Sequence, residues 1–176
     1  MSTPQPSTAL AKLRILDLSR VRAGPTCCRT LGDFGADIIK IEAPPGVDPN
    51  EGMSGARDGS DMLNLHRNKR CLTLNMKESA GHEIFMRLVK NSDVVVEDFR
   101  PDVKERLGID YKPLSAANPR IILASKDRRG GARFRISRQR GLPRRDSAAD
   151  RGRAPISRLL NSGGAVIVAC LLFFWG

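Results

Sequence analysis

The pattern of apolar and polar residues predicts alternating strands and helices over the first two thirds of the chain. A short apolar run at 14–18 ends before Ala23-Gly24-Pro25, and apolar residues then recur at spacings of three and four, as on one face of a helix. A second run, 37–42, is almost continuously apolar, which is typical of a strand covered on both faces of a parallel sheet. These segments predict a βαβ unit with a right-handed crossover.

The alternation continues to residue 125. The pattern predicts further strands and helices, with a surface loop rich in Pro, Gly and Asp at 44–61. We expect strands at 71–76, 93–99 and 120–125, and helices at 79–90, around 102–107 and at 113–117. The resulting fold class is α/β, with a Rossmann-like, mostly parallel sheet and flanking helices.

Two details of the predicted helices are testable. Ser79 is the expected N-cap of the helix at 79–90, and its inner face should consist of Ile84, Phe85, Leu88 and Val89. In the next helix, Asp102 and Glu105 have the spacing of a capping box, and Gly108 should end that helix.

Charge divides the chain into unequal parts. The net charge of the 176 residues is +11, yet residues 1–125 carry 18 Lys and Arg against 16 Asp and Glu. Residues 126–158 carry 12 basic and 3 acidic side chains without an apolar period, which predicts a disordered Arg-rich tail. The apolar run at 165–175 is shorter than the ~20 residues that span a bilayer. We therefore expect no membrane attachment.

The abrupt change at Lys126 has two explanations. A shifted reading frame, a gene-model error or a truncated gene would produce an aperiodic Arg-rich sequence of this kind. Alternatively, the segment 126–158 is a genuine basic tail that binds nucleic acid or an acidic partner nonspecifically. The first explanation is preferred, so we expect no specific nucleic-acid partner.

Cysteine and histidine usage predicts no metal site, since the four cysteines and two histidines show no ligand spacing. The adjacent Cys27 and Cys28 are expected to fill the core in a reducing compartment. The N-terminal segment lacks the apolar region of a secretory signal. We expect a cytoplasmic location, or a mitochondrial or peroxisomal matrix in a eukaryote.

Candidate binding residues follow the predicted strands. In open α/β sheets, ligands bind outside the carboxyl ends of the strands, where Arg22, Lys77 and Arg100 would meet an anion, with Arg106 one or two helical turns further on. Asn68-Lys69-Arg70 is either a second phosphate contact or a solvated charged run. The sequence contains neither a dinucleotide-binding fingerprint nor a phosphate-binding P-loop.

Five linked motifs resemble one enzyme family. They are ILDLSRVRAGP, GDFGADIIKIE, HRNKR with LTLNMK, DVVVEDFRPDVKERLGIDY, and NPRIILAS. Together the residues 13–125 resemble the N-terminal part of the class III CoA-transferases, the family of formyl-CoA transferase, carnitine CoA-transferase and α-methylacyl-CoA racemase. The resemblance implies an incomplete Rossmann-like large domain at 13–125, a non-family tail at 126–176, and coenzyme A as substrate or carrier. In the intact family it also implies an acyl-CoA, a small carboxylic acid and an interlocked homodimer.

The resemblance also implies which residues contact coenzyme A. Matched by motif, they are Arg22, Ala23, Leu74, Asn75, Met76, Lys77, Asp98, Phe99, Arg100 and Arg106. Two positions depart from the family pattern: Ala43 stands where some members have arginine, and Asp98 where asparagine is usual. No residue matches the nucleophilic aspartate of the transferases, since Asp146 and Asp150 lie in an Arg-rich context. We expect a fragment without transfer activity, and both transferase and racemase stay open for the parent enzyme.

Overall fold

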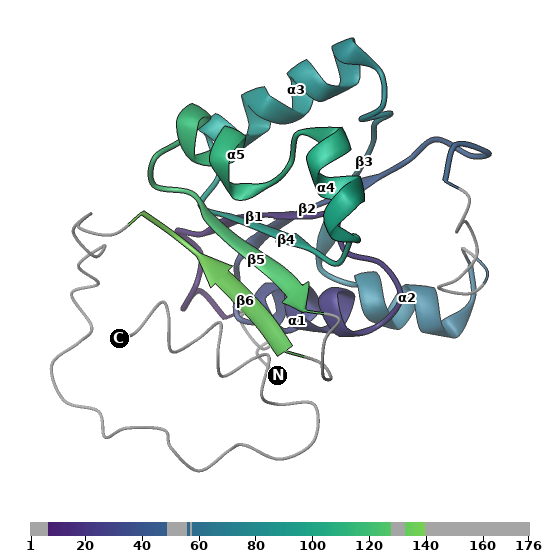
Figure 1. Cartoon of the computed structure of the whole chain (residues 1–176). Helices are drawn as coiled ribbons and strands as arrows, with labels where there is room; N and C mark the ends of the chain where they lie inside the picture. The colour runs from purple at the N-terminus through teal and green to yellow at the C-terminus, as the bar shows by residue number, and fades with distance from the viewer. Residues whose placement is uncertain (1–6, 49–55, 57, 128–132, 140–176) are drawn as a thin grey trace, which may run out of the picture.

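The protein, described here from a computed structural model, is a six-stranded sheet between two layers of helices (Figure 1). The structure describes residues 7–48, 56, 58–127 and 133–139. The strands are β1 (Arg14–Asp17), β2 (Asp37–Glu42), β3 (Lys69–Thr73), β4 (Val94–Glu97), β5 (Ile122–Asp127) and β6 (Arg133–Ser137). The helices are α1 (Ala23–Asp33), α2 (Ser60–His66), α3 (Ser79–Lys90), α4 (Pro101–Leu107) and α5 (Tyr111–Ala117).

The strand order is β3-β2-β1-β4-β5-β6, so β1 lies at the middle of the sheet and pairs with both β2 and β4. All neighbouring strands from β3 to β5 run parallel, and only β6 is antiparallel, to β5. In Figure 1, α1 and α2 cover one face of the sheet while α3, α4 and α5 cover the other. The order therefore reverses between β1 and β4, which is where ligands bind in open α/β sheets. The predicted fold class is confirmed.

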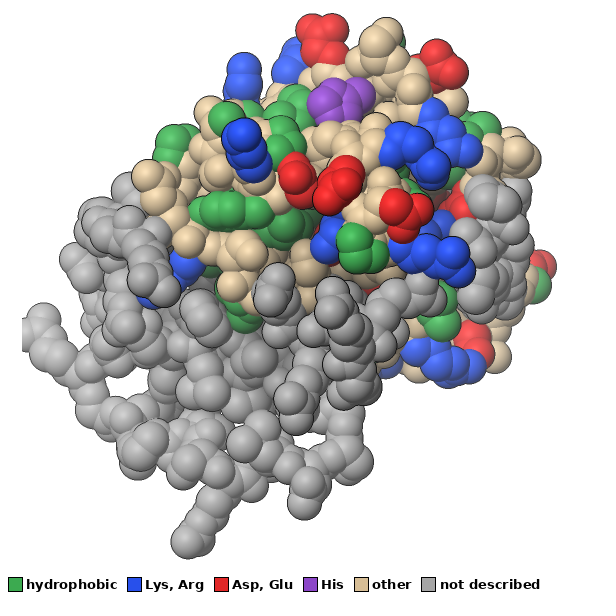
Figure 2. Space-filling view, viewed as in Figure 1, with side chains coloured by type: hydrophobic (Ala, Val, Ile, Leu, Met, Phe, Trp, Pro, Cys, Tyr) green, Lys and Arg blue, Asp and Glu red, His purple; other side chains and the backbone are tan. Residues whose placement is uncertain are grey.

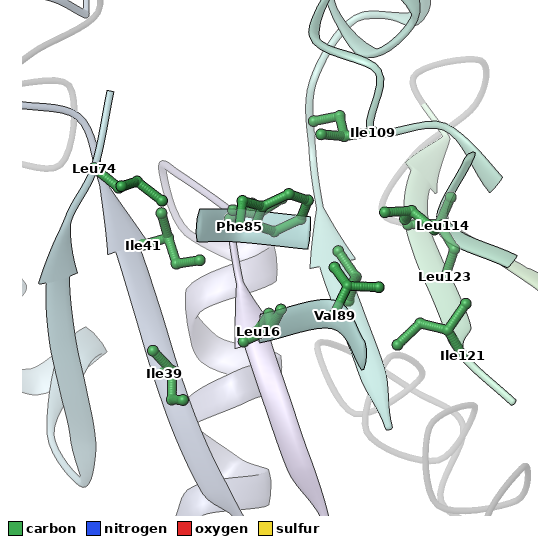
Figure 3. Packing of buried hydrophobic residues seen from close by; sticks show 12 residues of the cluster. Leu16, Ile39, Ile41, Leu74, Phe85, Val89, Ile109, Leu114, Ile121 and Leu123 are labelled. Carbon is green, nitrogen blue, oxygen red and sulfur yellow. The ribbon is translucent and has the colours of Figure 1, made fainter. Parts of the chain in front are cut away.

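Each face of the sheet has its own apolar core. On the face toward α3 and α5, fully buried Phe85 and Val89 pack on Leu16 and Ile41, as Figure 3 shows. On the opposite face, α1 contributes Cys27, Cys28 and Leu31, whose contacts include Ile15 and Ile38 of the strands. Strands covered on both faces are continuously apolar, which explains the runs visible in β1, β2 and β4.

Several local predictions are wrong. Helix α2 begins inside the predicted loop 44–61 and continues past it; it is only seven residues long and buries only Leu65, so it shows no clear apolar period. Strand β3 spans Lys69–Thr73, shifted from the predicted 71–76, because the aliphatic stem and amine of Lys69 are buried like an apolar residue. Ile84 is 42% exposed and lies outside the inner face of α3.

The helix caps also differ in part from the prediction. Ser79 is the first residue of α3 and Glu78 is its N-cap, while Arg100 is the N-cap of α4, and neither makes a side-chain capping bond. The expected end of α4 is confirmed: Gly108 has φ 61°, a left-handed conformation that glycine adopts without steric cost.

Strand β6 lies within the segment that was expected to be disordered. Residues 133–137 pair with 123–127 of β5 in antiparallel register, so the expectation of disorder is wrong for this part. Backbone pairing with an open sheet edge needs no apolar side-chain period, which is why the sequence did not reveal it. The rest of the predicted tail, from residue 140 onward, lies outside the described residues.

Candidate functional site

The loop from β1 to α1 is held by buried polar groups at the carboxyl edge of the sheet. Asp17 is fully buried and accepts hydrogen bonds from the Ser19 amide at 2.9 Å and from the Lys69 amine at 2.8 Å. Lys40 donates its amine to the Ser19 carbonyl. Burial alone would raise the pKa of Asp17, but the charges of Lys40 and Lys69 and these hydrogen bonds outweigh it and lower the pKa to about 2. Asp17 is therefore a charged anchor of the loop at neutral pH.

The same loop is tight and strained. A Cβ atom at Gly24 would lie 2.2 Å from the Cβ of Ser19, so only glycine fits where α1 begins. Val21 has φ 63°, a conformation that a β-branched residue adopts only where its surroundings enforce it. The Arg20 amide donates to Asp98 Oδ2 at 2.9 Å, which ties this loop to the loop after β4. The two strand-end loops thus form one connected surface.

Arg20 is the residue of this surface that the sequence interpretation missed. Its guanidinium lies 4.5 Å from the centre of the Phe99 ring and pairs with Asp48 at 2.7 Å. This arrangement combines a cation–π contact with an ion pair. Arg20 follows β1 as directly as Arg22 does, so its position at a strand end was the signal that could have identified it. Its pairing partners, far away in sequence, were not predictable.

A second network fixes the loop from β4 to α4. Glu97 is fully buried, accepts the Phe99 amide at 2.8 Å and pairs with the Lys104 amine at 3.1 Å. Lys104 also donates to Ser125 Oγ at 3.3 Å. Because these bonds join β4, α4 and β5, they hold Phe99 and Arg100 in place at the edge of the sheet.

Three of the residues that the resemblance assigns to coenzyme A line one groove. Met76 and Lys77 lie before α3 and Arg106 lies near the end of α4, and all three contribute to an open hollow of about 550 Å³. Within the described residues, the side chain of Arg106 makes no hydrogen bond or ion pair, while the Lys77 amine donates to the Val47 carbonyl at 2.9 Å. His82 of α3, not predicted as a site residue, also lines the groove. Figure 2 shows acidic and basic side chains interspersed over α3 and α4, with apolar atoms between them.

The remaining predicted residues lie along the same edge in varied environments. Arg22 is exposed at the N-cap of α1 and pairs with Asp61 of α2 at 2.6 Å, and Ala23 begins the helix. Arg100 is exposed at the N-cap of α4 and has no ion pair in the described structure.

Leu74 and Asn75 have structural contacts. Leu74 is buried in the core beneath α3, so its side chain points away from the edge. Asn75 Oδ1 accepts the Lys77 amide at 3.1 Å, which shapes the turn into α3. Any ligand contact of Leu74 would have to use its backbone.

Lys69 and Arg70 both pair with carboxylates of the sheet. The Lys69 side chain is fully buried against Asp17 and also donates to the Pro25 carbonyl at 3.0 Å. Arg70 pairs with Asp37 at 2.7 Å, at the amino end of β2. Lys69 is therefore a structural link between β3, β1 and α1 that is closed to a ligand, so neither a phosphate contact nor a solvated charge describes this residue.

Two further observations concern the part of the chain that the structure describes. No three His, Cys, Asp or Glu side chains within it come together as metal ligands would. Among its helices, none combines the length and the apolar character that a membrane crossing requires.

Comparison with known proteins identifies the family of this fold. The sequence model of CoA-transferase family III matches residues 10–132. An acyl-CoA transferase of Fusarium pseudograminearum is 41% identical over 127 residues, and a formyl-CoA:oxalate CoA-transferase of Afipia carboxidovorans is 41% identical over 120 residues. Each match covers 66% of this chain and 28% of the relative. The crystal structure of Rv3272 from M. tuberculosis is similar with a TM-score of 0.60 and 33% identity, over 69% of this chain and 32% of that one.

The chain belongs to CoA-transferase family III. It spans about 28% of the length of the relatives named above. The family match reaches residue 132, whereas the motifs recognised in the sequence end at Ser125.

Proposed function

We propose that this chain supplies the coenzyme A-binding N-terminal part of an enzyme that moves coenzyme A between an acyl-CoA and a small carboxylic acid. The names of the relatives, which are acyl-CoA and formyl-CoA:oxalate CoA-transferases, support transfer as the reaction of the parent enzyme. No observation on the described residues favours the racemase alternative.

One observation carries the proposal. Met76, Lys77 and Arg106 are up to 30 positions apart in the sequence, yet they line one groove at the edge where α/β sheets bind ligands. Arg106 has no anionic partner among the described residues, so its guanidinium remains available for a phosphate, which it binds with two parallel hydrogen bonds. Arg100, at the same edge, is equally available.

Adjacent groups fit the rest of a nucleotide thioester. Phe99 and the apolar parts of Met76 and Met86 offer surfaces for a base or an aliphatic arm. The loop Ser19–Gly24, held by Asp17 and Lys40, presents its backbone between β1 and β4, where the strand order reverses. In this proposal the chain binds and orients the carrier, and it supplies no nucleophile.

The chemistry of transfer needs a carboxylate that attacks the thioester carbon and expels the thiolate. No residue of this chain matches the family's nucleophilic aspartate, so we infer that the chain by itself does not transfer coenzyme A. The interlocked homodimer stays a prediction of the resemblance, and the cytoplasmic or matrix location stays a prediction from the N-terminal segment and the cysteines. Nucleic-acid binding by residues 126–158 stays the alternative interpretation, and the absence of a specific nucleic-acid partner stays the prediction, since most of that segment lies outside the described residues.

Calorimetric titration of the full chain with coenzyme A tests the proposal. The Arg106→Ala variant should bind at least ~10-fold more weakly than the wild type, because a charge-assisted contact to phosphate is lost. Arg87→Ala is the matched control, since Arg87 is an exposed arginine of α3 that does not line the groove. Titration with dephospho-CoA separates contacts to the 3′-phosphate from contacts to the diphosphate.

Saturable binding that Arg106→Ala weakens and Arg87→Ala leaves unchanged would support the assignment. The proposal fails if the wild type does not bind coenzyme A at millimolar concentration. It fails equally if the two variants bind with the same affinity.

A further inference from the structure

A second hollow lies at the opposite, amino edge of the sheet, away from the proposed coenzyme A site. It measures about 370 Å³ and shares no lining residue with the groove between α3 and α4. We call it the amino-edge pocket. Six charged residues line it. Arg14 and Asp37 begin β1 and β2, and Lys90 ends α3. Lys12, Asp93 and Arg120 lie in the segments before β1, β4 and β5.

The charges of the amino-edge pocket do not balance. Four cations face two carboxylates, and both carboxylates already have partners. Asp37 accepts the Arg14 Nε at 2.8 Å and pairs with Arg70, from outside the pocket, at 2.7 Å. Asp93 accepts the Arg14 amide at 2.9 Å. The pocket therefore presents excess positive charge.

Two of the cations are uncommitted. Lys90 and Arg120 are exposed, and within the described residues neither makes a side-chain hydrogen bond or ion pair. Arg14 directs Nε to Asp37 and Nη1 to the Asn91 carbonyl at 3.5 Å, and its Nη2 has no partner in the described structure. Three donors from three parts of the chain thus surround one hollow.

The hydrogen bonds of Asn118 connect the walls that carry these cations. Asn118 donates its side-chain amide to the carbonyls of Val89 at 2.9 Å and Ser92 at 2.8 Å, which ties the end of α3 to the segment before β5. Its Oδ1 accepts the Arg120 amide at 3.0 Å, so the backbone of Arg120 is also held. A site built in advance loses little entropy when it binds a ligand.

We propose that the amino-edge pocket binds a phosphate group, either as inorganic phosphate or on a small molecule. Arg14 and Arg120 offer the planar donors that match phosphate oxygens, and Lys90 adds a compact charge. Asparagine, serine and charged side chains dominate the lining, which suits a polar ligand better than an acyl chain. The hollow is larger than a single phosphate ion, so a phosphate ester of a small polar molecule also fits.

The competing explanation is that the cations only stabilise the fold. Lys90 is the last residue of α3, where a positive charge compensates the helix dipole. A purely structural role predicts that replacing Lys90 lowers stability equally with and without phosphate. A binding role predicts that the stabilising effect of phosphate itself disappears.

Titration of the full chain with sodium phosphate, at ionic strength held constant with sodium chloride, tests the proposal. Binding is followed through the side-chain amide signals of Asn118 in nitrogen–proton correlation spectra and through the phosphate-induced rise in melting temperature. A parallel titration with glycerol 3-phosphate separates the free ion from an ester. The double variant Lys90→Gln/Arg120→Gln should weaken binding at least ~10-fold.

Two control variants locate the ion. Lys112→Gln removes an exposed lysine of α5 that does not line the pocket, so binding should be unchanged. Arg106→Ala removes the phosphate contact proposed for the coenzyme A groove, so the phosphate-dependent shifts of the Asn118 signals should also be unchanged, whatever happens to the melting temperature. Success or failure here is therefore independent of the proposed function.

Saturable shifts of the Asn118 signals that the double variant abolishes would establish the site. The titration first finds the millimolar phosphate concentration that raises the melting temperature. The proposal is wrong if the Asn118 signals do not move even at 20 times that concentration. It is also wrong if the double variant binds as the wild type does, since the anion is then held elsewhere.

Discussion

The buried ion pair between Lys69 and Asp17 offers the sharpest test of how this fold is held together. Both side chains are fully buried, and the Lys69 amine lies 2.8 Å from Asp17 Oδ2 and 3.0 Å from the Pro25 carbonyl. One amine therefore joins β3, β1 and α1. Replacing Lys69 by methionine keeps the length and apolar stem of the side chain and removes only the charge and its donors.

The expected loss of stability is large for a single substitution. Removing one partner of a buried ion pair costs ~3–5 kcal/mol, because the other charge stays buried without compensation. Here Lys40 and Ser19 still face Asp17, so we expect the lower limit, about 3 kcal/mol. The lowered pKa of Asp17 gives a similar scale, since a shift from 3.8 to about 2 corresponds to about 2.5 kcal/mol of preference for the charged form.

The pH dependence supplies a second signature. The pKa of Asp17 is lower in the folded chain than in the unfolded chain, so its stabilisation is present above about pH 4 and is lost as the pH falls toward 2. Without Lys69, the folded pKa of Asp17 rises toward its unfolded value. The Lys69→Met variant should therefore lose less additional stability between pH 4 and pH 2 than the wild type does.

Urea unfolding followed by circular dichroism measures both effects. Lys112→Met is the control, because Lys112 is an exposed lysine of α5 and its replacement should change the unfolding free energy by less than ~0.5 kcal/mol. The double variant Asp17→Asn/Lys69→Met should recover part of the loss, because the carboxylate that Lys69 compensates is no longer buried, while Lys40 keeps its hydrogen bond to the Ser19 carbonyl. A loss below 1 kcal/mol for Lys69→Met at pH 7 would refute the reasoning.

Two further predictions concern pH and activity. Burial, followed by the charges of Lys69 and Lys40, lowers the pKa of His66 to about 4 in the folded chain. Because this pKa is below the unfolded value, the unfolded chain binds the proton first, and the unfolding free energy falls as the pH drops from about 6.5 to 4. In His66→Gln, the unfolding free energy measured in urea should fall by about 1–2 kcal/mol less over that pH range than in the wild type, allowing for partial exposure of the ring. An equal fall in both proteins would contradict the assignment. The purified chain, incubated with formyl-CoA or succinyl-CoA and a carboxylate such as oxalate, should produce no new acyl-CoA by liquid chromatography. Detectable exchange above the uncatalysed rate would show that the chain contains a nucleophile that its motifs do not reveal.

The buried position of Lys69 explains why the sequence left the charged run at 68–70 open between a phosphate contact and a solvated run. Lys69 and Arg70 look alike in sequence, and either was a plausible phosphate contact. The pleat of β3 turns Lys69 toward Asp17 and the interior, whereas Arg70 lies on the other side and pairs with Asp37. Whether Lys69 or Arg70 is buried depends on where Asp17 of β1, two strands away in the sheet, lies relative to β3, and local sequence does not contain that information.

The residues of the candidate site were largely predictable as a set, while their grouping was not. The carboxyl ends of parallel strands meet at one edge, so Arg22, Lys77, Arg100 and Arg106 were expected on the same side of the sheet. Only the packing of α3 against α4 decides that Lys77 and Arg106 line one groove with His82. Only the β1–β4 crossover places Arg20 over Phe99.

The amino-acid sequence by itself determined the α/β class, the positions of β1, β2, β4 and α3, and the family. These features depend on local periodicity, on glycine and proline at element ends, and on motifs of adjacent residues, all of which are readable along the chain. Tertiary structure alone decided the strand order, the antiparallel β6, the burial of Lys69 and the two hollows at opposite edges. These depend on contacts between segments far apart in sequence, where the surrounding strands and helices set the environment of each side chain.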